Sequence, residues 1–387
     1  MAEALEGAAG LAGSTESTSA HRVHTVTFSS VSNASPWPPE GDVMRDLPAR
    51  PDLTQLRHQA KDLLHEAKLG DASAEARIRA VSERRTLAAA QLALAREYGF
   101  PNWPKLKTEV VRREILDDRD VDRLAALLQD EPELATSPME HWCDHPQGAS
   151  PLGYVAMLRY DTSRDLWRDV SGTDVVATAL LDAGAPVDGE PGASETPLIT
   201  AASYGDAAVA RALIEAGADL DAIASPDSGG VPGGTALLHA AVFGMTEVVD
   251  VLVASGARVD GVEVAAAAGD VTGWLTDETP PDAATRALVM AADHQRLDVI
   301  ARLISHGVPV DAVDPVWGGH PLRTAAANGR PASVRCLLDH GADPDRTDDE
   351  GRTPLDLCRR ARPAAGSTAL QEVEATLEPL TSRMEGA

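Results

Sequence analysis

Apolar residues recur at helical spacing through most of the chain. Between residues 53 and 67, leucines and alanines follow one another every three or four positions, and Gly70 stands where that helix would end. Residues 73–81 and 86–97 are also rich in helix-forming side chains. The pattern predicts a small helical module over residues 47–113.

The first 46 residues lack such a pattern. They are rich in Ala, Gly, Ser, Thr and Pro, a composition that buries too little apolar surface to offset the entropy of ordering. We therefore expect residues 1–46 to be a disordered tail. Met44 precedes the first periodic segment directly, which makes it a candidate for the natural start of the protein.

After residue 114 one phrase occurs five times. The copies are LLDAGAPVDG (180–189), LIEAGADLDA (213–222), LVASGARVDG (252–261), LISHGVPVDA (303–312) and LLDHGADPDR (337–346). Their glycines are separated by 33, 39, 51 and 34 residues. An insertion at 225–234 explains the interval of 39. The interval of 51 requires an abbreviated unit at 262–275 and a linker at 276–282.

A second phrase stands upstream of the first and begins like a helix. Its copies are SPLGYVA (150–156), TPLITAA (196–202), TALLHAA (235–241), HPLRTAA (320–326) and TPLDLCR (353–359). Ser or Thr is a good N-cap, and proline fits the first turn of a helix. Each unit is thus predicted to be a helix pair, and such pairs bury their apolar faces only by stacking.

The helix that begins TPL, the second helix, the G-A-D turn and the period near 33 together resemble the ankyrin repeat. The resemblance implies an all-α solenoid over residues 114–387, with 370–380 as a capping helix. The histidine that usually follows TPL is absent from every copy, so we expect the stack to depend more on aliphatic packing. The segment from Leu47 to Leu106 is similar to leader segments of bacterial, actinomycete-like ankyrin proteins.

Ankyrin stacks bind other proteins on a concave face made of turn tips and the ends of the first helices. The resemblance places the following residues of this chain there: Tyr204, Phe243, His294, Trp317, Asn328 and Arg352. Interface hot spots are enriched in large aromatic side chains. The alternative is that these rings pack against the adjacent repeat.

Composition and charge narrow the class of partner. Aromatic residues make up 3% of the chain, so the core must be aliphatic. The net charge is −26, with residues 47–113 at +5 and residues 114–387 at −27. The strong negative potential of this charge disfavours binding to nucleic acid and favours a basic protein partner. The same charge also helps to keep the protein soluble. The basic module keeps a nucleic-acid-binding role open as the main alternative.

The chain has three cysteines, without a CxxC pair, and lacks an apolar stretch of about 18 residues. We therefore expect a cytoplasmic protein that does not span a membrane. Its N-terminus lacks the charged and apolar regions of a secretory signal.

Two groups of residues could carry chemistry. The loop at 139–148 contains His141, Cys143 and His145, which are metal-ligand types but also fit an ordinary repeat turn. The second group is His294, Trp317, His320 and His239, of which the last two fit structural positions of the repeat. Known nucleotide and hydrolase motifs are absent from the sequence. We predict neither enzymatic activity nor a cofactor, and a small-molecule-binding or enzymatic repeat protein is the remaining alternative.

Overall fold

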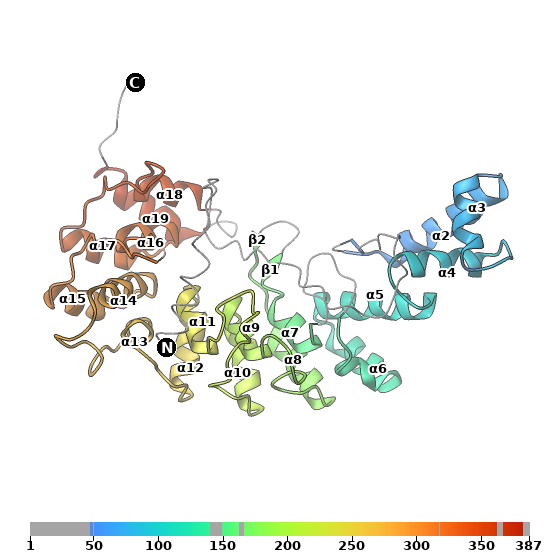
Figure 1. Cartoon of the computed structure of the whole chain (residues 1–387), viewed down its shortest axis with the longest axis horizontal. Helices are drawn as coiled ribbons and strands as arrows, with labels where there is room; N and C mark the ends of the chain where they lie inside the picture. Colours follow the sequence, from blue (N-terminus) through green and yellow to red (C-terminus); the bar gives the residue numbers. More distant parts are fainter. Residues whose placement is uncertain are drawn as a thin grey trace, which may run out of the picture. The chain divides into compact units, whose positions relative to one another are not determined.

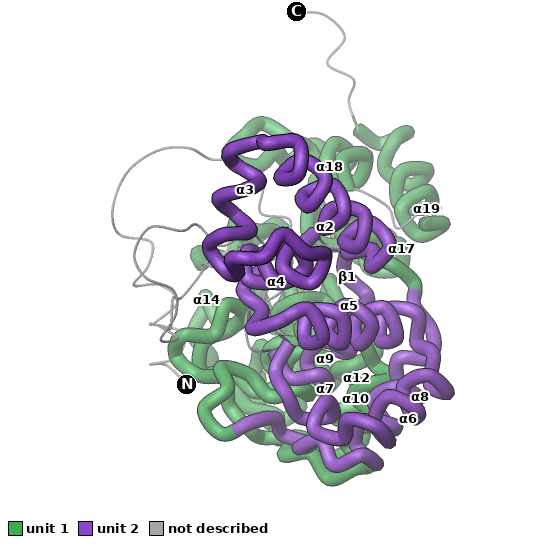
Figure 2. The backbone as a smooth tube through the Cα atoms, turned by 90° about the vertical axis from the view of Figure 1, so that its right-hand side faces the viewer, with its two compact units in different colours: residues 1–27, 166–169, 191–387 green, residues 28–165, 170–190 purple. Residues whose placement is uncertain are grey.

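The computed structural model describes residues 47–48, 50–139, 149–161, 166–316, 318–361 and 367–381. Nearly all regular structure in these residues is helical (Figure 1). They form two compact units (Figure 2). Unit 2 contains the described residues up to Asp161 together with 170–190, and unit 1 contains 166–169 and the described residues from 191 onward.

Unit 2 begins with the three predicted helices, α2 (Leu53–Lys68), α3 (Ala72–Arg79) and α4 (Leu87–Glu97). Each starts at a side chain that accepts a hydrogen bond from the backbone of the first turn: Asp52, Asp71 and Thr86. Small and branched apolar residues of all three helices form one core cluster. The helices of this module are therefore where the periodicity predicted them.

The predicted end of the module at residue 113 lies inside a helix. Helix α5 (Trp103–Asp118) is capped by Asn102 and continues for 16 residues, ending at Arg119 in the left-handed region. It is followed by α6 (Val121–Asp130) and the short 3₁₀ helix η1 (Pro132–Ala135). The net charge changes sign near residue 113, but the helix continues past it, because Ile115 and Leu116 are buried on the same helix.

The remaining elements of this part are α7 (Pro151–Ala156), β1 (Tyr160–Asp161) and α8 (Thr173–Asp182) in unit 2, and β2 (Leu166–Trp167) in unit 1. Tyr154 in α7 is fully buried, and its hydroxyl donates a hydrogen bond to Asp117 of α5. The first predicted helix pair, α7 and α8, is thus present.

Unit 1 contains the other repeats. Their first helices are α9 (Pro197–Ser203), α11 (Ala236–Val242), α13 (Val262–Ala268), α14 (Pro281–Asp293), α16 (Pro321–Ala327) and α18 (Pro354–Arg360). Their second helices are α10 (Ala207–Glu215), α12 (Thr246–Ala254), α15 (Leu297–Ser305), α17 (Pro331–Asp339) and α19 (Thr368–Leu377).

The interval of 51 residues has the predicted cause. Helix α13 is followed by turns rather than by a second helix, so this unit is abbreviated. The linker is shorter than predicted, because α14 already begins at Pro281. The glycine shared by the five long phrases, which follows the second helix of each unit, has a φ between 86° and 103°, a conformation that L side chains rarely adopt.

The core of unit 1 is aliphatic, as the composition predicted. Leucine, isoleucine, valine and alanine side chains from α13 to α19 form one continuous buried cluster. At its end, Val373 and Leu377 of α19 are completely buried against the preceding repeat, as expected of a capping helix. No helix in the described part of the chain is both long enough and apolar enough to cross a membrane.

Candidate protein-binding face

Turns that precede first helices of unit 1 form what we call the turn face, made up of residues 191–196, 219–235, 258–261, 309–316, 318–320 and 343–353. Of the six residues predicted to bind a partner, Arg352 lies in one of these turns, and four others follow the ends of first helices. Trp317 lies outside the described residues. The five described residues differ widely in exposure.

The structure corrects the prediction for His294. Its side chain is buried, with 1% of the residue exposed. One ring nitrogen bonds with the Thr246 hydroxyl at 3.0 Å, and the other with the Ala241 carbonyl at 2.9 Å. Burial lowers the pKa of this imidazole. A ring with both nitrogens engaged inside the stack cannot contact a partner.

Tyr204 is also largely buried, with 8% of the residue exposed. Its ring packs at a tilt against that of Trp167, with the centroids 6.2 Å apart. Phe243 is half-buried, and its ring meets that of His239 edge-on at 6.0 Å. For Tyr204 the structure shows packing against another repeat, which was the alternative to partner binding, whereas the contact of Phe243 lies within its own repeat.

Asn328 and Arg352 are half-buried and engaged within the fold. The Asn328 amide donates to Asp293 at 2.9 Å, and Arg330 donates to the same carboxylate oxygen at 3.1 Å. Arg352 donates to Asp348 at 2.8 Å. These side chains therefore stabilise contacts between and within the turns.

Asp293, Asn328, Arg330 and Gly244 form a polar cluster that links three repeats. Arg330 also donates to the Gly244 carbonyl at 2.6 Å. A Cβ atom at Gly244 would lie 2.6 Å from the Asp293 carboxylate, and Gly244 has a φ of 71°. Only glycine lets the chain pass this close to the carboxylate.

His239 joins two neighbouring repeats in a similar way. It is fully buried, and its ring nitrogens bond with the Ser203 hydroxyl at 2.8 Å and with the Val231 carbonyl at 3.0 Å. The usual ankyrin histidine is missing, but His239 and His294 supply inter-repeat hydrogen bonds from other positions. The expectation that aliphatic packing replaces these bonds is thus only partly correct.

The 225–234 insertion is an ordered loop above His239. The backbone N–H of Ser225 donates to the Ser194 carbonyl at 2.8 Å, and the Ser228 hydroxyl donates to Glu195. A Cβ atom at Gly230 would lie 2.7 Å from the His239 ring. These contacts fix the loop against the preceding turn.

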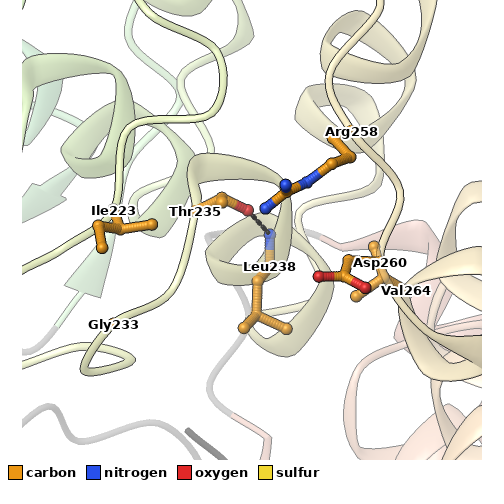
Figure 3. A pocket seen from close by; sticks show the side chains of 7 residues that line it. All are labelled: Ile223, Gly233, Thr235, Leu238, Arg258, Asp260 and Val264. Atoms are coloured by element: carbon orange, nitrogen blue, oxygen red, sulfur yellow. Dashed lines mark hydrogen bonds between the residues drawn. The ribbon is translucent and has the colours of Figure 1, made fainter. Parts of the chain in front are cut away.

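A pocket of ≈ 170 Å³ lies beside this loop (Figure 3). Its lining comes from the turn before α11, from α11 itself, and from the turn that leads into α13: Ile223, Gly233, Thr235, Leu238, Arg258, Asp260 and Val264. Ile223 is 67% exposed, whereas Val264 is 3% exposed at the base of α13. Two successive segments of the turn face, together with α11 and α13, thus line one apolar depression.

These pocket residues are not among those predicted from the sequence to bind a partner. From the spacing of the repeats alone, the insertion is only the cause of an irregular interval. Ile223 stands in DLDAIASPDSGG (219–230), where an isoleucine precedes a polar loop. That exposed isoleucine was the available signal, but one apolar residue in a turn is ordinary until its neighbours in space are known.

Two observations on the described residues concern metal binding and nucleophilic chemistry. Among the described residues, no group of three or more His, Cys, Asp or Glu side chains could hold a metal ion. The candidate loop His141–His145 lies outside the described residues. Burial raises the pKa of the Cys358 thiol to about 11, so this thiol is not a nucleophile at neutral pH.

His320, a member of the second candidate group, caps α16 as the repeat alignment suggested. Its Nδ1 atom accepts the Arg323 backbone N–H at 3.4 Å. Burial and the nearby Arg346 and Arg323 lower its pKa to about 4. His239 and His294 belong to separate hydrogen-bond networks, so the described histidines do not form one acid–base site.

Comparison with known families gives a match that agrees with this architecture. The family described as ankyrin repeats matches residues 170–262 and 283–368. These stretches are ankyrin repeats. They include the helix pairs from α8 to α12 and from α14 to α18, and the gap between them contains most of the abbreviated unit.

Short segments of the chain are similar to parts of curated proteins. Mouse 2-5A-dependent ribonuclease is 35% identical over 69 residues, 18% of this chain and 9% of the relative. Human ARF GTPase-activating protein GIT1 is 38% identical over 65 residues, 17% of this chain and 8% of the relative. The chain therefore matches less than a tenth of the length of either relative.

Among solved structures, the ankyrin repeat domain of human ASB11 matches 68% of this chain and 95% of its own. The sequence identity is 23% and the TM-score is 0.35.

Proposed function

We propose that the protein is a non-catalytic interaction module that binds a partner protein on the turn face, which corresponds to the concave face of an ankyrin stack. The observation that carries this proposal is the pocket beside α11, an apolar depression lined by two successive segments of the turn face and by α11 and α13. Ankyrin repeats typically serve protein–protein interaction, and this family match supports the same class of function.

The turn face is held in place before any partner binds. The Asp221 carboxylate accepts the Arg258 backbone N–H of the next turn at 2.9 Å, and Asp311 accepts the Asp343 N–H at 3.2 Å. Because these bonds connect consecutive turns, binding would order few additional groups. A pre-organised surface loses less entropy on association.

The contacts of the basic helices favour protein binding over the nucleic-acid alternative. Arg77 pairs with Glu97, and both Arg79 and Arg85 pair with Glu75. Arg112 and Arg113 are buried, and Arg112 donates to the carbonyls of Leu134, Ser137 and Pro138. Several of the cations counted in the basic module are thus occupied within the fold and do not present charge to phosphates.

The cellular setting belongs to the same proposal. Cys336 and Cys358, the cysteines of the described part, are both free thiols, which supports a reducing cytoplasm. The resemblance of the N-terminal segment to bacterial leaders supports a bacterial origin.

The proposal can be tested by site-specific photo-crosslinking in lysate of the source organism. A photoreactive residue would replace Asp227, Val313 or Asp349 on the turn face, and Asp298 or Asp339 on the second helices as controls; all five residues are exposed. We expect one protein to crosslink to the turn-face positions. Crosslinks confined to Asp298 and Asp339, or the absence of protein crosslinks at every position, would contradict the proposal.

A further inference from the structure

The size of the pocket beside α11 limits what it can hold. Its volume is ≈ 170 Å³. Small-molecule sites usually measure about 300–1,000 Å³, whereas an apolar cavity of about 150 Å³ accommodates a benzene-sized group. The pocket therefore has room for one apolar side chain rather than for a complete organic cofactor.

The walls of the pocket are aliphatic. Ile223 and Leu238 lie on opposite sides of the turn that leads into α11, and Val264 comes from α13 (Figure 3). Ile223 is 67% exposed and Leu238 is half-buried, so an inserted side chain would cover apolar surface that now meets water. Such burial favours binding by about 25 cal/mol for each Å² covered.

Two residues of opposite charge line the pocket. Asp260 and Arg258 both line it and both are exposed. The neighbouring turn adds the exposed carboxylates of Asp219, Asp221 and Asp227. Of these three, Asp221 contacts a pocket residue, because its carboxylate accepts the Arg258 backbone N–H at 2.9 Å. The carboxylates of Asp260 and Asp221 therefore outnumber the Arg258 guanidinium at this rim, which favours an additional cation.

We propose that this pocket binds a basic segment of a protein partner, with one aliphatic side chain inserted between Ile223 and Leu238 and a lysine or arginine facing Asp260. The inference rests on the proposed function and specifies the chemistry of the partner. The 225–234 loop contributes by closing one side of the pocket through Gly233.

The contacts of the loop are specific to this repeat. The Ala224 N–H donates to the Gly234 carbonyl and the Gly233 N–H donates to the Ala224 carbonyl, which folds the insertion back on Ile223. Ile223 also forms an antiparallel bridge with Thr235. The turn before α16 has a different layout, in which Asp314 accepts the N–H of Val316 at 3.0 Å.

The test is selection of binders from a display library of random twelve-residue peptides on the full chain. Enriched peptides are synthesised with a fluorescent label, and their Kd values are measured by anisotropy. We expect enriched peptides to combine a Leu, Ile or Val with two or more Lys or Arg residues. Their binding should weaken as salt is raised, because part of the attraction is between exposed charges.

Variants connect the peptides to the pocket. Ile223→Ser and Asp260→Lys are each expected to raise the Kd at least about tenfold, which corresponds to about 1.4 kcal/mol. Ile223→Leu should retain binding. The matched controls Val313→Ser and Asp349→Lys alter an exposed aliphatic and an exposed acidic residue of other turns, and should change the Kd less than about twofold.

Several outcomes would overturn the inference: enrichment of acidic or uncharged peptides, binders that ignore both pocket variants, or a library that yields no binder. If peptides bind both pocket variants but fail to bind Val313→Ser or Asp349→Lys, the peptide site lies elsewhere on the turn face. That result would refute the assignment to the pocket and leave the proposed function intact. A urea unfolding midpoint for each variant confirms that lost binding is not lost folding.

Discussion

The pocket beside α11 lies where first helices of unit 1 begin, and the polar cluster around Asp293 lies where first helices end; the two regions differ in how their polar groups are satisfied. Asp293 is 6% exposed, and its carboxylate accepts from both Asn328 and Arg330. Asp260 is exposed, and within the described residues its carboxylate has no hydrogen-bond partner or ion pair.

This difference distinguishes polar residues that hold the stack together from polar residues that remain available to a partner. A buried group without its partner costs several kcal/mol, so groups such as those of Asp293 and His294 are bound to stay engaged. An exposed group keeps its water until a partner displaces it. The two regions differ in whether their polar groups are buried and already hydrogen-bonded, and not in the types of residue that they contain.

The largest effect is expected where the buried cluster is broken. Asp293→Ala should lower the free energy of unfolding by about 3 kcal/mol, because Arg330 and Asn328 lose their acceptor in a buried site. Urea unfolding followed by circular dichroism measures this. The exposed carboxylate of Asp349 provides the control, since Asp349→Ala should change stability by less than about 0.5 kcal/mol. Equal effects of the two variants would remove the distinction between the regions.

The pH dependence of stability provides a second test. The pKa of His320 is about 4 in the folded protein, below the usual 6.5, so the unfolded chain binds more protons between these values. Stability should therefore fall as the pH drops from about 6.5 towards 4, by about 2 kcal/mol at pH 5. His320→Asn keeps a capping side chain without titrating, and its stability should fall less over this range. An unchanged slope would show that His320 does not contribute.

A smaller effect is expected where the insertion meets the stack. Gly230→Ala would place a Cβ atom 2.7 Å from the His239 ring, so the loop must shift. We expect a loss of about 1 kcal/mol, the lower range for overpacking, because a surface loop can adjust. Asp227→Ala changes the same loop at an exposed position and should have no measurable effect on the thermal midpoint.

The smallest effect on folding is expected in the pocket itself. Ile223→Ser should change the free energy of unfolding by less than about 0.5 kcal/mol, because the side chain is already 67% exposed. Leu237→Ser, at a fully buried position of α11, should cost more than about 3 kcal/mol. A large loss with Ile223→Ser would mean that Ile223 serves packing, which would place the pocket with the buried cluster.

Much of the fold could be predicted from local sequence. Helix starts depend on a capping side chain and a proline, and TPL phrases such as Thr353–Leu355 carry both. Helix ends depend on a residue that tolerates a positive φ, which Gly217 and Gly341 supply. The prediction was less accurate where these signals are weak, as at residue 113, where charge changes but the helix continues.

The candidate site was predicted poorly, for a different physical reason. Tyr204, Phe243, His294 and Asn328 occupy equivalent repeat positions, so the resemblance assigned them one role, yet only packing decides how much of each is exposed. The pocket joins Ile223, Leu238 and Asp260 from separate segments, and distances between segments are not encoded in spacing along the chain. The sequence by itself determined the repeat, its helices and its aliphatic core, because those depend on near neighbours. Which polar groups are hydrogen-bonded and which surface stays exposed follows only from the tertiary structure, because both depend on contacts between repeats.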